Sequence, residues 1–248
     1  MVVTGITMIT TDEQPREAID VSGSDNRIEN NYIAGFDDRG IVIDGNGADN
    51  NQVLNNVVTG GADYTSNDKA GIFIRNADDT LIVGNVVAQN NMDAIALQSA
   101  QRTMIAHNTL ANNANGLVFA GWGSNRRSSD TCARNNLITH HGWGAGVVSR
   151  SGTTWDTSSH CASTSGYGNS TYGNGVSCDM TTCYGCNCLP TDTWWQYEHE
   201  PNYLTTERGE TGYYCLGNSE FEDLGRDLGY DLNGDQSGHF NGSGPDIG

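Results

Sequence analysis

The chain has 248 residues, enough for one sizeable domain with an appendage. Its 30 acidic side chains against 12 basic ones give a formal net charge of −18, which argues against nucleic acid as a partner because phosphate is repelled by such a surface. No apolar run approaches the roughly 20 residues that a membrane span needs. The acidic surface suits a secreted protein that holds Ca²⁺, one that handles neutral or cationic glycans, or one with no ligand at all.

The first residues, 1–6, have the composition of a strand and lack the basic-then-apolar order of a signal peptide. No amphipathic segment precedes them to cap the end of a stack of strands. We therefore expect either that a leader has been removed or that the chain is part of a larger protein.

A short phrase recurs five times along residues 26–138. It consists of an aliphatic or small residue, two free positions, an asparagine, one free position and an aliphatic residue. The framed asparagines are Asn31, Asn56, Asn85, Asn108 and Asn136. Their separations are 25, 29, 23 and 28 residues (56−31, 85−56, 108−85 and 136−108). A period in the twenties indicates stacked supersecondary units.

A second, apolar phrase follows each copy of the first. Its five copies are residues 40–43, 71–74, 94–97, 116–119 and 146–149. Each unit therefore holds two predicted short strands, separated by turns rich in Asn, Asp and Gly, with no helical period between them. Such a unit buries its apolar side only when stacked coils pair strand to parallel strand. We expect the framed asparagines to stack inside, each amide bonding to the next and to backbone groups freed at the bend.

These phrases resemble the repeats of right-handed parallel β-helix proteins, the architecture shared by pectate lyases, polygalacturonases, alginate-modifying enzymes and phage tailspikes. The resemblance covers roughly residues 20–150 and implies an all-β fold, a right-handed parallel β-helix (solenoid) over residues 1–150. It implies little about activity, because this fold hosts many unrelated sites. Residues 92–97 resemble the paired-aspartate strand of polygalacturonases, with Met92 in place of the first Asp. Other polygalacturonase elements, and the Asp-Pro-His signature of mannuronan epimerases, are missing.

After residue 150 the repeat ends, and residues 151–220 are rich in Ser, Thr, Gly, Cys and aromatic residues. Six of the seven cysteines lie from Cys161 to Cys215, which favours disulfides and an oxidising, extracellular location. The Cys183/Cys186 pair has the spacing of a zinc knuckle, but no second matching pair follows. We expect an irregular lid held by disulfides, with one cysteine left unpaired or joining two chains, on a protein secreted or displayed on a bacterial surface.

The tail, residues 221–248, is acidic and resembles the closing segment of secreted bacterial β-helix proteins. Alternate oxygen-bearing side chains resemble the first ligands of a calcium loop, where hard oxygens suit a hard cation. These predicted Ca²⁺ ligands are Asp231, Asn233 and Asp235. The full EF-hand signature fails, since Gln236 stands where Gly is wanted and Gly242 where Glu is wanted. A solvated acidic turn is the alternative.

The turn entering the second strand of each unit is the most polar column of the predicted stack. Carboxylates on coils about 4.8 Å apart raise one another's proton affinity, and such pairs act as general acid and base in glycoside cleavage. Asp38 paired with Asp68 or Asp93 is the predicted catalytic pair, and Lys69 or His141 is a candidate base for a lyase. The alternative is that Asp and Asn simply favour tight turns.

On the other side of the same strands, arginines gather in an otherwise acidic chain. Arginine forks bind carboxylates bidentately, and tryptophan offers a flat face to a sugar ring. The predicted substrate-binding residues, a subsite for a uronate, are Arg75, Gln98, Trp122, Arg126 and Arg150. These arginines could instead pair with acidic neighbours.

Alternation along the second strand of each unit also places an apolar stripe outward. Its members are Val42, Phe73, Ala96, Val118 and Val148, and the inward set is Ile41, Ile43, Ile72, Ile74, Ile95, Leu97, Leu117 and Phe119. Such a stripe should not face water uncovered. Either the Cys-rich segment packs on it, or it lines a groove for a ligand or partner.

The leading hypothesis from the sequence is a monomeric carbohydrate-active enzyme, a glycoside hydrolase or polysaccharide lyase that acts on an extracellular polysaccharide. The alternative is a non-catalytic carbohydrate-binding, adhesin or structural module of a larger surface protein, which the lack of any recognisable catalytic motif favours.

Overall fold

The computed structural model describes residues 1–10, 15–61, 69–120, 128, 131–134, 136–139, 147–149, 169–172 and 194–196. Every regular element within these ranges is a β-strand, and every strand pair between neighbouring coils is parallel. The predicted all-β parallel β-helix is therefore confirmed. The described residues contain no helix that is long and apolar enough to cross a membrane.

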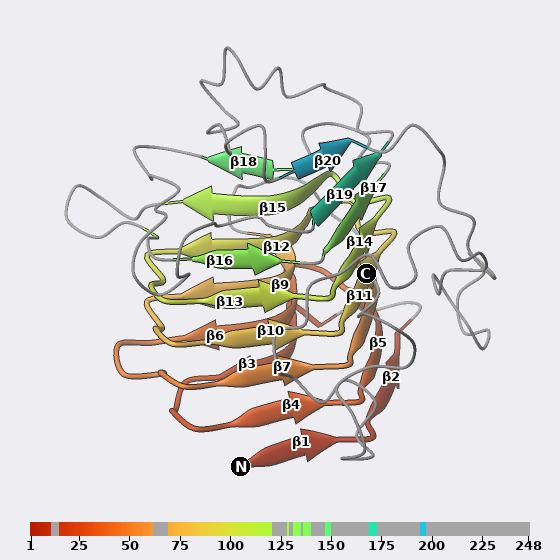
Figure 1. Ribbon diagram of the computed structural model, residues 1–248. Coiled ribbons are helices and arrows are strands. Elements are labelled where there is room, and N and C mark those ends of the chain that lie inside the picture. The colour runs from red at the N-terminus through yellow and green to blue at the C-terminus, as the bar shows by residue number, and fades with distance from the viewer. Residues whose placement is uncertain are drawn as a thin grey trace, which may run out of the picture.

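Three parallel sheets form the walls of the solenoid. From β1 to β18 each coil adds one strand to each wall, and β19 and β20 extend one sheet further (Figure 1). Sheet A consists of β1 (Val2–Thr4), β4 (Arg27–Glu29), β7 (Gln52–Leu54), β10 (Leu81–Val83), β13 (Met104–Ala106) and β16 (Cys132–Arg134). Sheet B consists of β2 (Thr7–Ile9), β5 (Tyr32–Phe36), β8 (Val57–Gly61), β11 (Val86–Ala88), β14 (Thr109–Ala111), β17 (Leu137–Thr139), β19 (Asn169–Tyr172) and β20 (Trp194–Gln196). Sheet C consists of β3 (Glu17–Val21), β6 (Arg39–Asp44), β9 (Ala70–Arg75), β12 (Asp93–Gln98), β15 (Asn115–Ala120) and β18 (Val147–Ser149).

Each coil thus has three strands where the sequence pattern predicted two. The first predicted strand is split by its own asparagine into one strand of sheet A and one of sheet B. The chain turns there because the residue before that asparagine adopts a positive φ of 54° at Asn30, 52° at Asn55 and 53° at His107. In the intervening coil the same position is Gly84, where a Cβ would lie 2.2 Å from the side-chain oxygen of Asn55. Glycine at this position leaves room for the Asn55 side chain and adopts the positive φ without strain.

The framed asparagines form a continuous amide ladder inside the bend between sheets A and B. The Nδ2 group of Asn85 donates to Oδ1 of Asn108 at 2.9 Å and to the carbonyl of Val53 at 2.9 Å. Oδ1 of Asn85 accepts the backbone N–H of Asn56 at 2.9 Å and its Nδ2 group at 3.0 Å. The predicted stacking of these amides is confirmed, from Asn31 through Asn136.

The other two bends carry shorter asparagine stacks that the repeat pattern did not indicate. Between sheets C and A, Oδ1 of Asn51 accepts the backbone N–H of Asn26 at 2.8 Å. Between sheets B and C, Nδ2 of Asn90 donates to Oδ1 of Asn113 at 2.8 Å. All three corners of the coil therefore satisfy backbone groups with amide side chains, at least over part of the stack.

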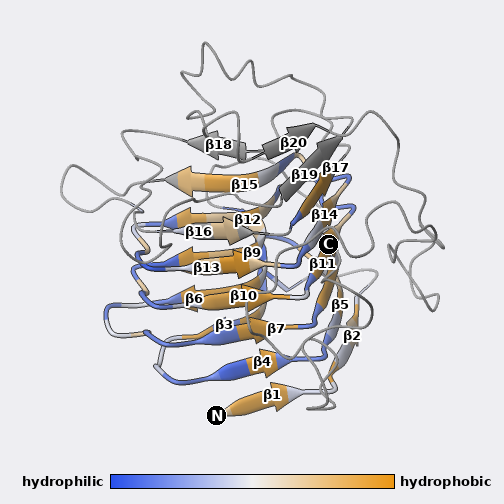
Figure 2. Cartoon of the chain, in the orientation of Figure 1, coloured by the Kyte–Doolittle hydropathy of each residue, from blue (hydrophilic) through white to orange (hydrophobic). Residues whose placement is uncertain are grey.

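The space between the walls is filled by one aliphatic cluster. All eight residues predicted to point inward from sheet C belong to it, with relative exposures of 0–4%. Figure 2 shows hydrophobic colour on many of the strands, such as β10 and β13, and hydrophilic colour at the bends and on β3 and β4. At about 25 cal/mol per Å² of buried apolar surface, this shared core holds the coils together.

We predict that Asn85→Ala destabilises the fold by roughly 2–4 kcal/mol, because buried donors and acceptors on two neighbouring coils lose their partner. Denaturant unfolding measures the loss. Asn50→Gly is the control, because Asn50 is an exposed bend residue with a φ of 56° that glycine also adopts. Equal stability of the two variants would contradict the ladder's role.

Candidate functional site

The outer face of sheet C carries the polar groups that the sequence singled out, in three columns set by the strand register. The first column lies at the starts of the strands and consists of Glu17, Arg39, Ala70, Asp93 and Asn115. The middle column is Asp20, Val42, Phe73, Ala96 and Val118. The last column is Asp44, Arg75, Gln98 and Ala120. Since pairing is parallel and in register, residues from separate coils become neighbours.

The predicted apolar stripe is the middle column, and it does not face water. Val42, Phe73, Ala96 and Val118 have exposures of 3%, 1%, 3% and 1% and form a cluster of their own together with Ala70. On the described part of the chain, two guanidinium groups lie over the ring of Phe73: that of Arg39 at 4.7 Å and that of Arg75 at 5.9 Å from its centroid. Two cation–π contacts therefore meet at Phe73 on the outside of the sheet.

Five of the predicted site residues lie within the described part of the chain: Asp38, Lys69, Arg75, Asp93 and Gln98. The others lie outside the described residues and stay predictions. They are the proposed catalytic Asp68 and His141, the proposed sugar-binding Trp122, Arg126 and Arg150, and the proposed Ca²⁺ ligands Asp231, Asn233 and Asp235.

Asp38 lies just before β6 and is held by two cations from its neighbouring coils. Its Oδ1 accepts Nζ of Lys69 at 2.7 Å, and its Oδ2 accepts Nε of Arg16 at 2.7 Å. Asp38 and Lys69 are both buried, whereas the Arg16 side chain is exposed. Burial alone would raise the pKa of Asp38, but the hydrogen bonds from Lys69 and Arg16 outweigh it and hold the pKa below its ordinary value. Asp38 is therefore an anion at neutral pH.

Asp93 begins β12 and is fully buried. Its Oδ1 accepts Nδ2 of Asn115, on the next coil, at 2.6 Å. Asp93 pairs in register with Ala70 on the preceding coil, and Ala70 pairs with Arg39 on the coil before that. Asp38, the residue before Arg39, is therefore two coils from Asp93 and shifted by one residue along the strand. Two coils correspond to about 9.6 Å, beyond the ~5–5.5 Å of a retaining carboxylate pair and at the upper limit of an inverting pair. Lys69 occupies the coil between the two acids.

The last column contains a second ion pair, between Nη2 of Arg75 and Oδ2 of Asp44. Both side chains are about one-quarter exposed, at 26% and 25%. The next residue in that column, Gln98, is buried. Arg75 thus pairs with an acidic neighbour, as the alternative interpretation of the sequence allowed.

Sequence reasoning gave no role to three residues that shape this face: Arg16, Glu17 and Arg39. Nη1 of Arg39 donates to Oε1 of Glu17 at 2.6 Å, which places that guanidinium over Phe73. The sequence contained a signal for the Glu17–Arg39 pair, because Glu17 precedes Arg39 by 22 residues, about the length of one coil. The first coil has no framed asparagine, so the repeat was not extended that far.

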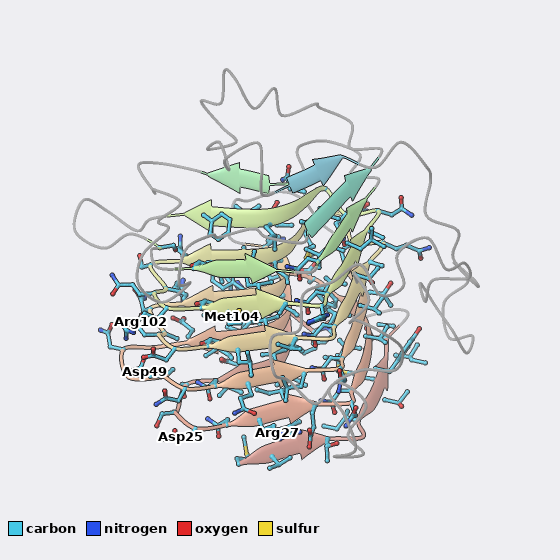
Figure 3. All side chains as sticks on the ribbon, in the orientation of Figure 1. Asp25, Arg27, Asp49, Arg102 and Met104 are labelled. Atoms are coloured by element: carbon cyan, nitrogen blue, oxygen red, sulfur yellow. The ribbon has the colours of Figure 1, made fainter. Side chains whose placement is uncertain are left out.

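A second group of polar residues lies along the bend between sheets C and A. Asp25, Asp49 and Arg102 lie one above another there (Figure 3). Oδ1 of Asp49 accepts the backbone N–H of Asp78 at 2.8 Å. Arg102 pairs with Asp79 at 2.8 Å and with Asp78 at 3.3 Å, and the hydrogen bond to Asp79 is the chief cause of its raised pKa. These contacts tie coils together, and no group of three or more His, Cys, Asp or Glu in the described ranges is arranged to hold a metal ion.

We predict that Lys69→Met lowers the free energy of unfolding by about 2–4 kcal/mol at neutral pH, because it leaves a buried carboxylate with only an exposed partner. The loss should shrink in acid. A lowered folded-state pKa gives stability that is complete above the unfolded value of about 3.9 and is lost as pH falls through the folded value. Denaturant unfolding across this pH range measures both effects.

Arg27→Met is the matched control, since Arg27 and Glu29 form an ion pair in which the Arg27 side chain is half exposed. Solvent screening makes such a pair worth little. A Lys69→Met loss that is no larger than the control, or that does not depend on pH, would contradict the assignment.

No curated protein and no solved structure is significantly similar to this chain. One family model matches residues 3–175, more than two thirds of the sequence, and thus spans the described coils. Because the match covers more than half of the chain, the chain belongs to the family described as periplasmic copper-binding protein (NosD).

Proposed function

We propose that the protein is a β-helix of the cell envelope or extracellular space that binds a polysaccharide at the partly exposed part of the outer face of sheet C, on β3, β6 and β9. The observation that carries this proposal is the pair of arginines beside Phe73, each fixed by a carboxylate on the preceding coil. The family's description as periplasmic is consistent with this location.

The first coils of this face suit a glycan because two ion pairs, Glu17–Arg39 and Asp44–Arg75, place donors and acceptors on neighbouring strands about 4.8 Å apart. The Asp44–Arg75 and Glu17–Arg39 pairs have acid side chains that are 25% and 29% exposed, so both offer oxygen atoms to sugar hydroxyls. The guanidinium planes cover Phe73, so a sugar would meet the arginines rather than the ring. Charges are nearly balanced here, in contrast to the chain as a whole, which suits a neutral or weakly acidic glycan.

A second candidate is cleavage of that polysaccharide, as a hydrolase or lyase, with Asp93 as the proton-transferring group. The observation that favours it is the position of Asp93 at the start of β12, one coil from Lys69. Because the Asp93 side chain is fully buried, a substrate would reach it only when this part of the face opens. Lys69, on the adjoining coil, would supply positive charge to a reacting uronate. The pairing of Asp38 with two cations favours binding without cleavage.

Copper is named in the description of the family, but no group of three or more His, Cys, Asp or Glu among the described residues is arranged to hold a metal ion. Cu(I) prefers thiolate and thioether ligands, and Cu(II) prefers imidazole. His107 is the one histidine in the described ranges, and it is buried. The clustered cysteines from Cys161 to Cys215 lie outside those ranges, as does the proposed Ca²⁺ loop at Asp231, so neither metal enters the function proposed for sheet C.

We predict that Arg75→Gln weakens binding to the preferred polysaccharide by about tenfold or more, because a charge-assisted hydrogen bond is worth ~1.5–3 kcal/mol. Calorimetry against a panel of neutral and uronate-containing polysaccharides identifies that ligand and measures the change. Arg102→Gln is the control, since Arg102 is also ion-paired but lies on another corner. Equal affinity of both variants, or no binding to any polysaccharide, would overturn the proposal.

Cleavage is tested separately with Asp93→Asn, assayed for reducing ends and for unsaturated products on the polysaccharide that binds. The expected result for an enzyme is loss of product by at least ~100-fold with binding retained, as for removal of a general acid or base. Unsaturated product would mark a lyase. Binding with no product from the native chain would leave a binding module as the function.

A further inference from the structure

The turn that joins β6 to β7 presents an Asn-Gly sequence to solvent. Gly45, Asn46, Gly47 and Ala48 form a β-turn closed by the backbone N–H of Ala48, which donates to the carbonyl of Gly45 at 3.0 Å. Gly47 has a φ of +91°, as the third residue of a type II turn requires. Asn46 and Gly47 are both exposed, and the space where a Cβ of Gly47 would stand is empty.

This arrangement brings together what intramolecular attack on an amide needs. The nucleophile is the backbone nitrogen of Gly47, which carries no side chain to hinder its approach to Cγ of Asn46. The hydrogen bond that closes the turn is made by the next nitrogen along, that of Ala48. A surface turn is also free to sample the backbone geometry that ring closure demands.

The chain contains an internal comparison, the Asn115-Gly116 sequence. Asn115 is only 6% exposed, and its Nδ2 group donates to Oδ1 of Asp93 at 2.6 Å. Gly116 lies inside β15, which pairs with β12 on one side and β18 on the other. The strand on both sides of Gly116 and the hydrogen bond from Asn115 to Asp93 restrain this sequence, so we expect the same dipeptide to be protected there.

We infer that Asn46 is a site of spontaneous covalent modification, at which the folded protein converts to aspartate and isoaspartate forms. The nitrogen of Gly47 bonds to Cγ of Asn46, the bond from Cγ to Nδ2 breaks, and Nδ2 leaves as ammonia with the proton of Gly47. Water then opens the cyclic imide. Attack at Cγ gives aspartate, and attack at the main-chain carbonyl gives isoaspartate.

Both products add a negative charge beside Asp44 and Asp49, and isoaspartate also adds a methylene group to the main chain. The turn follows directly on Asp44, whose partner Arg75 lies over Phe73. Modification therefore alters the connection between sheets C and A next to an ion pair of the outer face.

The test is a time course on the full chain in mildly alkaline buffer, followed by peptide mapping and enzymatic labelling of isoaspartate. The expected result is conversion at Asn46 at least about tenfold faster than at Asn115, because a strand residue reacts only after local opening. In denaturant the two sites should convert at similar rates. Mapping also separates the Asn-Gly sequences at Asn174, Asn233 and Asn241, which lie outside the described residues.

Asn46→Gln is the matched variant, because glutamine must form a larger ring and reacts far more slowly. In this variant, the more acidic form of the protein that arises from modification of this peptide should be absent. Two results would overturn the inference. One is that Asn46 stays unmodified in the folded chain over a time in which it is converted in the unfolded chain. The other is that Asn46 and Asn115 are converted at equal rates in the folded chain.

Discussion

The fold depends on satisfying the backbone groups that leave the strand ladders at each corner of the coil. A parallel sheet provides partners along its strands, but a sharp bend orients donors and acceptors inward, where no water competes. An asparagine at the bend solves this, because its amide is donor and acceptor at once. In Asn85 the Nδ2 group reaches back to a carbonyl of the preceding coil and forward to the next amide, while Oδ1 accepts a backbone N–H. Aspartate lacks the donors for this, and an aliphatic residue lacks both functions.

The register fixed by those ladders and by the core determines what can gather on the outside. Once Ile41, Ile72 and Ile95 are aligned inward, the outward residues of the same strands are aligned as well. Charges one coil apart then lie within reach of each other, and they are paired: Lys69 with Asp38 and Arg75 with Asp44. In a chain with a net charge of −18, this local balance gives the outer face of sheet C a character unlike the average surface.

The sequence predicted the parts of this structure that repeat and missed those that depend on geometry between coils. The framed asparagines and the alternating aliphatics fixed the fold class and the inward set, because each recurs in the same frame. The division of each first phrase into two strands was missed, since a positive φ at residues such as His107 is not visible in an apolar pattern. Arg39 was missed as a partner of Phe73, because that contact joins neighbouring coils that are 31 residues apart on sheet C, outside the 23–29 residues that separate the framed asparagines.

A fold built this way separates stability from function along a single strand. In β9 the inward residues Ile72 and Ile74 belong to the shared core, whereas the outward Phe73 and Arg75 belong to the face proposed to bind a glycan. Replacing an outward side chain changes a contact between neighbouring coils but leaves the amide ladders intact, since those lie at the corners. Members of one β-helix family can therefore keep the coils and change the ligand. For this reason the membership of this chain in a family named for copper fits its coils, while its ligand must be inferred from the outward columns of sheet C.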